Sequence, residues 1–424
     1  MFRWTRKEAA EGAVVEPEER LSWPHTVALG AQHVVAMFGG TVLGPLLMGF
    51  DANVAVLMSG IGTLVFFVAT GGRVPSYLGS SFSFIAAVIA ATGYSGQGAN
   101  PDLGAALGGI VACGAAYAAI GIVVMATGSD WIERLMPPVV TGTVVAVIGL
   151  NLATLPIKTM APTAFDVWLQ AATFLVVALV AVYARGMVRR LLILVGLAFS
   201  TALYAVLANG LGWGKPIDLS PIAQAAWIGL PTLGTPVFRP EAMVLIVPVA
   251  LVLVAENLGH LKAVGAMTGR DMAPWIGRAF VGDGVATMLS GSVGGTGITT
   301  YAENIGIMAA TRIYSTAVFV VAALVAIALG LSPKFGALVH CIPLAALGGV
   351  SIVIFGLIAV AGARIWIDNR VDFTDGRNMM VAAIALVLGT GDFTLAVGPL
   401  SLGGIGTATF GAILLNALLR RGAA

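Results

Sequence analysis

Residues 296–312 read TGITTYAENIGIMAATR and place a carboxylate and an amide, Glu303 and Asn304, inside an almost wholly apolar chain. The preceding residues, SGSVGGTGITTY, are rich in glycine, serine and threonine, which disfavours a full-length regular membrane helix. We therefore expect a broken or extended segment followed by a half-helix that faces a cavity. A charged side chain in such surroundings is costly, so it needs a partner or a function.

The composition of the whole chain indicates a polytopic membrane protein. Of its 424 residues 58% are hydrophobic and 10% are charged, and the mean hydropathy is +0.97. Soluble domains have about 45–50% apolar and about 25% charged residues. A net charge of +2 without a basic patch argues against a nucleic-acid partner. Cys113 and Cys341 lie in apolar runs, which favours packing over a disulfide or a metal site.

Fourteen apolar segments are long enough to span a membrane or resemble broken spans. They cover residues 26–49, 53–70, 76–94, 103–127, 137–155, 165–184, 190–212, 241–262, 276–293, 296–312, 313–331, 337–361, 377–391 and 402–419. Residues 1–25 carry charges of both signs without an apolar core, which indicates a cytosolic tail and not a signal peptide.

The basic residues support this number of spans. If the N-terminus is cytosolic, all of the 22 lysines and arginines fall on the cytosolic side except Lys158, Lys215, Arg239 and Lys334. One span more or fewer in the middle would destroy this asymmetry. We therefore expect both termini in the cytosol.

The two halves resemble each other in three places that keep their order. Residues 31–33, 81–84 and 136–137 correspond to residues 255–257, 300–303 and 342–343. Seven spans per copy is an odd number, so the second copy is inverted relative to the first. Inverted repeats place binding near the membrane midplane, at discontinuous helices.

Few ionisable residues lie within the spans, and they are the candidates for function. Glu256 and His260 are four residues apart and share a helix face. They either form a satisfied pair that locks packing or belong to a cavity, and Glu303 favours the cavity. Two carboxylates and a histidine can bind N–H groups and carry a proton. Asp283 either partners a helix terminus or tunes the proton step, and the sequence favours neither.

Aromatic residues flank the same region. The repeat places Ser81 and Phe82 opposite Thr300 and Tyr301. A ring beside a polar cavity suits a flat heteroaromatic ligand, whose carbonyl oxygens could meet backbone N–H groups near Phe82 and Ala302.

Other polar side chains and missing motifs narrow the function further. Gln32 and His33 either shape the pocket or satisfy neighbouring helices, and the sequence supports both readings about equally. The chain has no P-loop, no HExxH motif and no voltage-sensor arginine spacing. A secondary transporter without a cofactor, and not an enzyme or an ATP-driven pump, is the class that remains.

ENIGIMAATR resembles the signature of the nucleobase–ascorbate transporter family, which is Gln, Glu or Pro, then Asn-x-Gly, four residues, Thr and a basic residue or Gly. Gln32-His33 and AENLGHL resemble two further motifs of that family. The resemblance implies an all-α membrane protein of 14 spans, with short antiparallel strands in spans 3 and 10, and a homodimer. It divides the chain into a core (residues 26–127 and 241–331) and a gate (residues 128–240 and 332–419).

The resemblance also implies roles for individual residues. Glu256 and Glu303 match the substrate-binding carboxylates and His260 the histidine near the base, while Phe82 and Tyr301 match the flanking residues. A glutamate at 303 is typical of uracil-type members. Relatives often have glycine where Ala302 stands, so the pocket volume differs here.

These observations and the resemblance predict uptake of a pyrimidine nucleobase together with a proton, as the core moves against the gate, with uracil as the first candidate and thymine as the second. The proton is expected on Glu303, with Glu256 and His260 as further carriers, and the sequence does not fix this division. A purine or xanthine symporter of the same family is the nearest alternative. An anion transporter of the same architecture is less favoured, because two glutamates repel anions.

Overall fold

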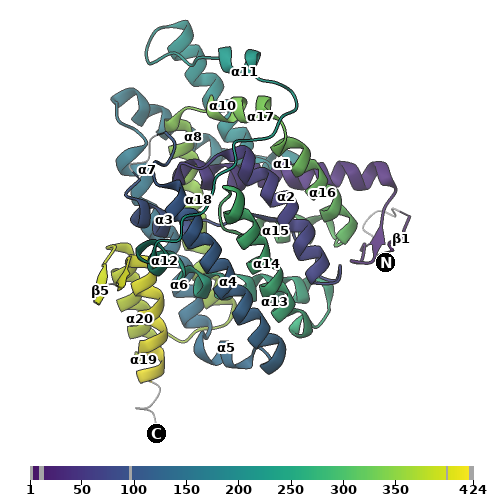
Figure 1. Cartoon of the computed structure of the whole chain (residues 1–424), viewed down its shortest axis with the longest axis vertical. Helices are drawn as coiled ribbons and strands as arrows, with labels where there is room; N and C mark the ends of the chain where they lie inside the picture. The colour runs from purple at the N-terminus through teal and green to yellow at the C-terminus, as the bar shows by residue number, and fades with distance from the viewer. Residues whose placement is uncertain (1–2, 9–13, 95–97, 398–399, 420–424) are drawn as a thin grey trace.

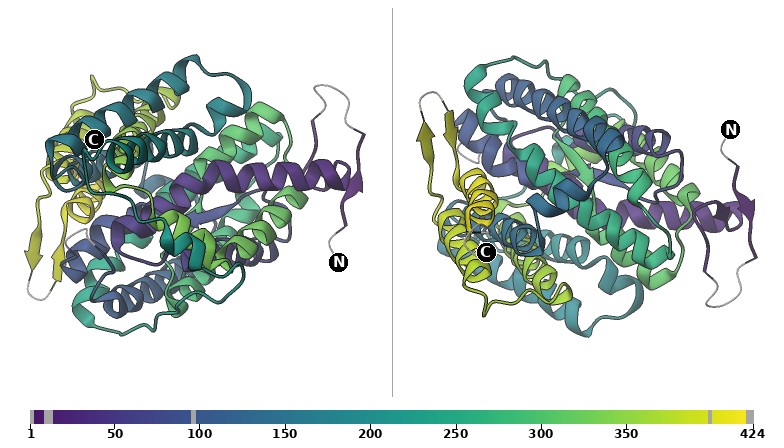
Figure 2. Two further views of the ribbon diagram at one scale, coloured as in Figure 1. Left: turned by 90° about the horizontal axis from the view of Figure 1, so that it is seen from above. Right: turned by 90° about the horizontal axis from the view of Figure 1, so that it is seen from below.

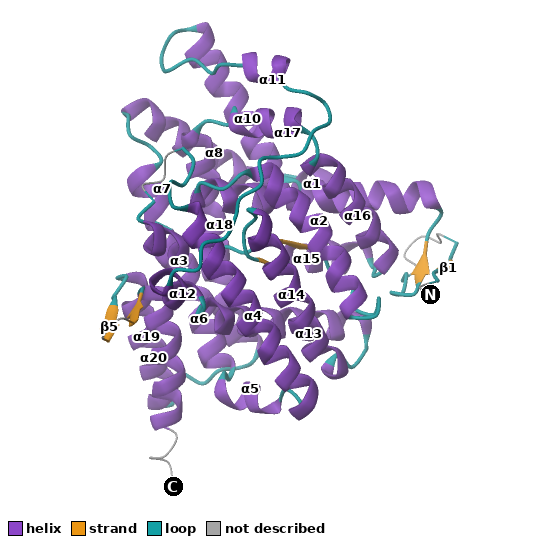
Figure 3. Cartoon of the chain, viewed as in Figure 1, coloured by secondary structure: helices purple, strands orange, loops and turns teal. Residues whose placement is uncertain are grey.

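The computed structural model describes residues 3–8, 14–94, 98–397 and 400–419. Helices dominate and the strands are few and short (Figure 3). In this part of the chain eight helices are long and apolar enough to cross a membrane, and α16 (Thr316–Gly330) with α17 (Pro333–His340) forms a pair bent by 79°. Further apolar helices of 10–17 residues lie among them. The prediction of a helical, polytopic membrane protein is confirmed.

The helices pack into two groups. Members of the first group contact α2, α4, α14 or α16, except α15, which contacts α1 and α13, and they come from two separate stretches of the chain. They are α1 (Trp23–Met48), α2 (Ala52–Ala69), α3 (Ser83–Thr92), α4 (Leu103–Thr127), α12 (Pro240–Ile246), α13 (Val249–Thr268), α14 (Ala273–Val293), α15 (Ala302–Thr311) and α16. Figure 2 shows α1 extending from the N-terminal strands into the middle of the molecule.

The second group is centred on α6 (Pro138–Leu152) and α18 (Leu344–Asp368), which pack along each other. The remaining members are α5 (Asp130–Leu135), α7 (Thr154–Thr159), α8 (Ala164–Tyr183), α9 (Gly186–Arg190), α10 (Leu192–Ala205), the π-helix η1 (Val206–Gly210), α19 (Gly376–Thr390) and α20 (Gly404–Leu419). α11 (Ser220–Gln224) and α17 contact each other at one end of the molecule (Figure 1). The hairpin of β5 (Leu395–Val397) and β6 (Leu400–Leu402) precedes α20.

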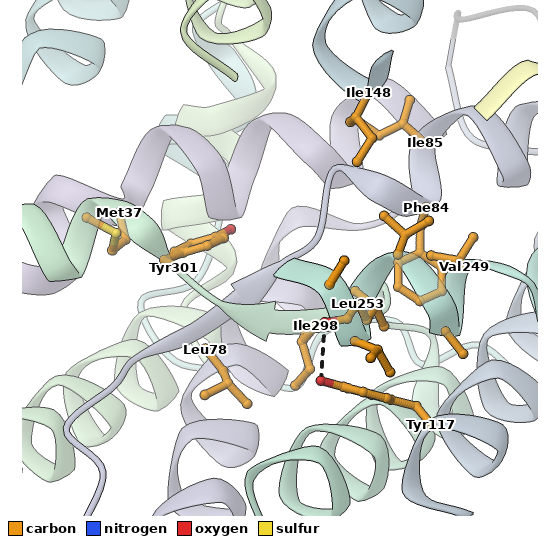
Figure 4. Close-up of a cluster of buried hydrophobic side chains, with 14 of the residues drawn as sticks. Met37, Leu78, Phe84, Ile85, Tyr117, Ile148, Val249, Leu253, Ile298 and Tyr301 are labelled. Atoms are coloured by element: carbon orange, nitrogen blue, oxygen red, sulfur yellow. Dashed lines mark hydrogen bonds between the residues drawn. The ribbon is translucent and has the colours of Figure 1, made fainter. Parts of the chain in front are cut away.

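Two short strands cross at the centre of the first group. β3 (Leu78–Ser80) and β4 (Ile298–Thr300) are antiparallel, with Gly79 opposite Thr299. Each strand leads into a helix of ten residues, α3 or α15. The expectation of antiparallel strands followed by half-helices in these two segments is confirmed, and Figure 4 shows the apolar side chains that bury the crossing.

The strands are extended because neighbouring helices satisfy their backbone groups. On α2, Thr63 accepts a hydrogen bond from the Leu78 amide at 2.9 Å. On α14, Thr287 donates to the Ile298 carbonyl at 3.0 Å. Glycine is required within β3 and directly before β4, since a Cβ on Gly79 would lie 2.5 Å from the Tyr301 ring and one on Gly297 would lie 2.2 Å from Phe84.

The predicted spans differ from the helices in two places. The span expected at residues 241–262 is broken into α12 and α13, because Pro248 has no amide hydrogen and ends the first helix. The span expected at residues 337–361 was wrong in position. Residues 337–340 belong to α17, and the long helix α18 begins only after Pro343 and continues to Asp368.

The N-terminal segment is bound along one end of the first helix group. Val15 is 2% exposed and pairs through both of its backbone groups with residues 312–314, directly after α15. Glu18 accepts hydrogen bonds from Arg73, at 2.6 Å, and from Arg270, at 2.7 Å. We call residues 14–20 the N-terminal strap. It ties together three loops of one helix group.

Candidate functional site

The candidate site lies where α3 and α15 begin. Ser81 is buried, and its amide donates to the Gly297 carbonyl at 2.9 Å, so the two strand–helix junctions are joined directly. Phe82 stands at the N-terminal cap of α3 and is only partly buried. Its ring forms a T-shaped pair with that of Phe355 from α18, with centroids 6.0 Å apart. This contact connects the two helix groups at the site.

Glu256 on α13 faces the start of α3. The hydroxyl of Ser83 points at Glu256 Oε2 from 3.5 Å, a long contact that leaves room for movement. The Glu256 side chain is half-buried and lies within electrostatic reach of Glu303 and Asp283. A carboxylate in this position can accept N–H hydrogen bonds from a ligand.

His260 lies one turn further along α13. Its Nδ1 is 2.8 Å from the Thr300 hydroxyl, and that hydroxyl donates its proton to Asn257 Oδ1. Because Thr300 has a single hydroxyl proton, it must accept from Nδ1–H of His260. The neutral ring therefore keeps Nε2 as an acceptor, and this atom can receive a proton.

Glu303 occupies the first turn of α15, and both it and Ala302 are exposed to open space. The N-terminal end of a helix favours a negative charge and offers free backbone N–H groups. Glu303 and the neighbouring amides can thus interact with donors and acceptors of one ligand. Alanine at position 302, where relatives often have glycine, leaves the backbone accessible.

The Tyr301 side chain is buried, whereas a residue that flanks an open pocket would have an exposed ring. It is 6% exposed, its hydroxyl donates to the Ser80 carbonyl at 2.9 Å, and its ring packs against Gly79 and Gly40. Figure 4 shows the ring beside Met37 at the start of α15. In this arrangement Tyr301 supports the strand crossing, and Phe82 is the more accessible ring.

Two buried asparagines follow the two glutamates. Asn257 donates to Asp283 Oδ2 and to the Tyr117 hydroxyl, the latter at 2.5 Å. Asn304 lies 2.8 Å from His33 Nδ1 on α1. Adjacent residues on a helix point about 100° apart. Because the asparagines are anchored inside the helix group, the glutamates beside them point out of it.

Three polar residues for which the sequence left two readings open have buried polar atoms. Asp283 is fully buried, and within the described residues its Oδ1 has no hydrogen-bond partner. His33 is 3% exposed and also stacks against Phe319. The Nε2 of Gln32 is buried and likewise has no partner in the described part of the chain.

A cavity of about 490 Å³ lies between the two helix groups. α3, α12 and α13 line one side, and α6, α7 and the start of α20 line the other. Ser83 is the site residue that it reaches. Asn151, Lys158 and Asp392, which also line it, come from the second group. Within the described residues no group of three His, Cys, Asp or Glu side chains could hold a metal ion.

Sequence reasoning missed three features of the site. Phe355 was not anticipated, because no local signal distinguishes it from other apolar residues of α18. Ser83 lay within the quoted segment but its contact with Glu256 was not foreseen. The third feature was readable in the sequence: the pentapeptide Ala-Glu-Asn-x-Gly occurs twice, at 255–259 and at 302–306.

Comparison with known proteins finds a matching family model and similar permeases. A family model described as "Permease family" (Xan_ur_permease) matches residues 24–398. The putative pyrimidine permease RutG of Escherichia coli K12 is 63% identical over 99% of this chain and 95% of its own length. The uracil permease of Bacillus caldolyticus is 39% identical over 96% of this chain and 94% of its own length.

Solved structures share the fold at low identity. The transmembrane domain of the cyanobacterial bicarbonate transporter BicA has a TM-score of 0.63 at 15% identity, covering 93% of this chain and 97% of that chain. The murine anion transporter Slc26a9 in its inward-facing state has a TM-score of 0.67 at 13% identity, covering 96% and 70%. The family match and the close relatives together show that this integral membrane protein belongs to the xanthine/uracil permease family, the nucleobase–ascorbate transporters.

Proposed function

We propose that this protein imports a pyrimidine nucleobase, uracil in the first place and thymine as a second substrate, by proton symport. The observation that carries the proposal is the pair of carboxylates, Glu256 and Glu303, on the contacting helices α13 and α15. The names of its relatives, a putative pyrimidine permease and several uracil permeases, support the choice of substrate.

The chemistry of a pyrimidine fits these groups. The ring N–H groups of uracil are donors that Glu256 can accept, and its carbonyl oxygens suit the free amides at the starts of α3 and α15. Phe82 offers a ring face for stacking. In this proposal Glu303 takes up the coupled proton, and His260 Nε2 is a third group that can hold it.

Fourteen segments in an inverted repeat are part of the proposal. The elements can be grouped, in chain order, as α1, α2, β3 with α3, α4, α6 with α7, α8, α10 with η1, α12 with α13, α14, β4 with α15, α16, α18, α19 and α20. Matched anchors support the repeat, because Thr63 on the second segment and Thr287 on the ninth hold the strands of the third and tenth.

The two helix groups are proposed to be the moving parts. The first group corresponds to a core of residues 26–127 and 241–331, and the second to a gate of residues 128–240 and 332–419. Sliding of the core against the gate would expose the site to each side of the membrane in turn. We further propose an inner-membrane location, cytosolic termini and a homodimer, with the exposed apolar side chains of α8 and α10 facing lipid or the second copy.

Uptake of labelled uracil into proteoliposomes, with and without an inward proton gradient, tests the proposal. We expect accumulation only with the gradient, and no accumulation by Glu256→Gln or Glu303→Gln. Uptake that ignores the gradient would disprove symport. A Glu303→Gln variant that still concentrates uracil would remove the proton role of Glu303.

Competition experiments separate the alternatives. Excess unlabelled thymine is expected to reduce uracil uptake, and xanthine and hypoxanthine are expected to leave it unchanged. The solved structures with this fold include anion transporters, but identities of 13–15% carry over the fold alone. Thermal stabilisation by sulfate or bicarbonate, without an effect of any nucleobase, would favour anion transport.

A further inference from the structure

A second cavity, of about 320 Å³, lies at the opposite end of the second helix group from the cavity described above. The first cavity reaches the last residues of α6 and the start of α20, whereas this one reaches the residue before α6 and the last turn of α20. Figure 1 shows α5, α19 and α20 in the lower part of the molecule, and α5 contacts α20. The cavity is lined by Asp130, Glu133, Arg134, Pro137, Arg377 and Asn416, none of which belongs to the candidate site.

Two helices of 15 residues begin at this cavity. α6 starts directly after Pro137, which provides no side-chain hydrogen bond to cap it, and Arg377 is the second residue of α19. The N-terminal end of a helix carries free backbone N–H groups and a partial positive charge. The Asp375 carboxylate accepts a hydrogen bond from the Arg377 amide at 2.9 Å, so α19 is capped, whereas α6 is not. The start of α6 therefore favours a negatively charged group in the cavity.

Two polar atoms at the cavity are buried without a hydrogen-bond partner among the described residues. Asn416 is only 3% exposed, and its Oδ1 receives no hydrogen bond. The Nε of Arg377 is likewise buried and donates to no acceptor. Buried polar groups without a partner are unfavourable and therefore rare in native proteins. A ligand in the cavity satisfies both atoms if it brings an acceptor for the guanidinium group and a donor for the amide oxygen.

The charged side chains at the cavity match such a ligand. Asp130 and Arg134 are four residues apart on α5, yet neither forms an ion pair within the described part of the chain. Glu133 binds Lys262 of α13 instead, with 3.1 Å between Oε1 and Nζ. The guanidinium groups of Arg134 and Arg377 and one carboxylate thus face the cavity without a counter-ion among these residues. Guanidinium groups bind phosphate in a forked geometry, and a carboxylate accepts hydrogen bonds from an ammonium group.

We propose that this cavity binds a phosphate ester that also carries an ammonium group, with phosphoethanolamine as the simplest example. The phosphate lies between the two guanidinium groups, near the start of α6. The ammonium group donates to Asp130 and to Asn416 Oδ1. The cavity lies away from the carboxylates of the candidate site, so this inference goes beyond the proposed function and does not depend on it.

Two sources share this chemistry, a free phosphate ester and the headgroup of a phospholipid. The structure favours the phospholipid, because α5 also exposes the apolar side chains of Trp131 and Leu135. Tryptophan is enriched at the membrane–water interface, where a headgroup could fill the cavity while acyl chains cover these side chains. α5 links α4 of the first helix group to α6 of the second, so an occupied cavity stabilises α5 against α19 and α20.

Thermal unfolding of the full-length protein, delipidated in detergent, tests the proposal. We expect short-chain phosphatidylethanolamine to raise Tm in a saturable way, because a ligand that binds only the folded state stabilises it. Phosphatidylcholine of the same chain length has no N–H group on its ammonium, and phosphatidylglycerol has no ammonium group. Both should need concentrations about 10-fold higher, because a charge-assisted hydrogen bond is lost.

Free phosphoethanolamine distinguishes the two sources. If it raises Tm as effectively as the lipid does, the ligand is a soluble ester, and if only the lipid acts, the ligand is a membrane component. Equal shifts of Tm with all three lipids would show non-specific stabilisation and overturn the proposal. The absence of any shift would overturn it as well and would leave water as the occupant of the cavity.

Two variants and a matched control assign the effect to this cavity. Arg377→Gln should raise the concentration of phosphatidylethanolamine for half of the Tm shift about 10-fold or more. Arg364→Gln is the control and should leave this concentration unchanged, because Arg364 on α18 is exposed, lies 3.4 Å from Asp368 and does not line the cavity.

Asp130→Asn provides a second test that does not disturb a buried group, because Asp130 is exposed. The variant keeps both guanidinium groups and removes the negative charge that receives the ammonium group. We expect it to bind phosphatidylethanolamine no more tightly than phosphatidylglycerol. A preference for phosphatidylethanolamine that persists unchanged in Asp130→Asn, or an Arg377→Gln variant with the affinity of the wild type, would contradict the proposal.

Discussion

Asn304 of α15 and His33 of α1 are 271 residues apart in the sequence, and 2.8 Å separates Asn304 Oδ1 from His33 Nδ1. Both side chains are buried, so the contact fixes the rotation of the short helix α15 about its own axis. Glu303 precedes Asn304 directly, and its direction depends on that rotation. A buried pair behind the site thus orients a carboxylate within it.

The energetic coupling of this pair can be measured. Asn304→Ala and His33→Ala each leave the other side chain buried without this hydrogen bond. A buried polar group without its partner typically costs about 1–3 kcal/mol in unfolding free energy. The double variant should lose clearly less than the sum of the two, because their mutual contact is then lost only once and neither of the two is left without the other. Chemical unfolding of the purified protein in detergent measures all three. Strictly additive losses would show that the two residues do not act together.

Asp283 offers a prediction that separates two readings of the sequence. It is fully buried behind Asn257 and does not face the open space at Glu303. We therefore expect Asp283→Asn to keep gradient-dependent uracil uptake and to lower the unfolding free energy by about 1–3 kcal/mol, because the new amide NH2 group would lie where the buried Oδ1 has no hydrogen-bond partner among the described residues. Proteoliposome uptake checks this. Loss of proton dependence with an intact fold would assign Asp283 to proton transfer.

The site was predictable from sequence where chemistry is local. Glu256 and His260 could be placed together because helical spacing alone puts them on one face, and Glu303 was conspicuous as a charge in an apolar run. The strands before α3 and α15 followed from the family resemblance and from a run of glycine, serine and threonine.

The features of the fold and of the site that could not be predicted depend on packing between segments that are distant in the sequence. Tyr301 could not be recognised as a supporting ring, because its environment consists of Gly40 on α1 and Gly79 on β3. The shift of α18 to residues 344–368 was hidden because residues 337–361 are apolar apart from His340 and Ser351, and only Pro343 marks the true start of the helix. The contact of Phe355 with Phe82 joins segments 273 positions apart, which no local pattern encodes.

The N-terminal strap predicts a dependence of stability on pH. Hydrogen bonds, the largest contribution coming from Arg270 and a smaller one from Arg73, lower the pKa of Glu18 to about 2. A carboxyl group with a lowered pKa in the folded state stabilises the protein above its ordinary pKa near 4.5 and loses this effect as the pH falls toward 2. The group is partly exposed, so its contribution is about 1 kcal/mol or less.

Thermal unfolding of the wild type and of Glu18→Gln between pH 7 and pH 3 checks this. The difference in Tm should be constant down to about pH 4.5 and shrink below it. Glu241→Gln is a suitable control, because Glu241 is exposed and forms no ion pair within the described residues. A difference for Glu18→Gln that persists unchanged at pH 3 would contradict the role of the ionised carboxylate.

The contact between Phe82 and Phe355 crosses the boundary between the two helix groups, and its rings meet edge to face at 86°. Such pairs contribute about 0.5–1.5 kcal/mol beyond the area that they bury. If the contact holds Phe82 in place for stacking, Phe355→Leu removes the aromatic contact and leaves a smaller apolar side chain. We expect KM for uracil to rise about 2- to 10-fold in Phe355→Leu, and Tm of the ligand-free protein to fall, because Phe355 is fully buried and the smaller side chain leaves a cavity. Phe82→Leu should raise KM further, and the double variant should equal Phe82→Leu, because Phe355 acts through Phe82. Effects that multiply in the double variant would show that Phe355 meets the substrate independently.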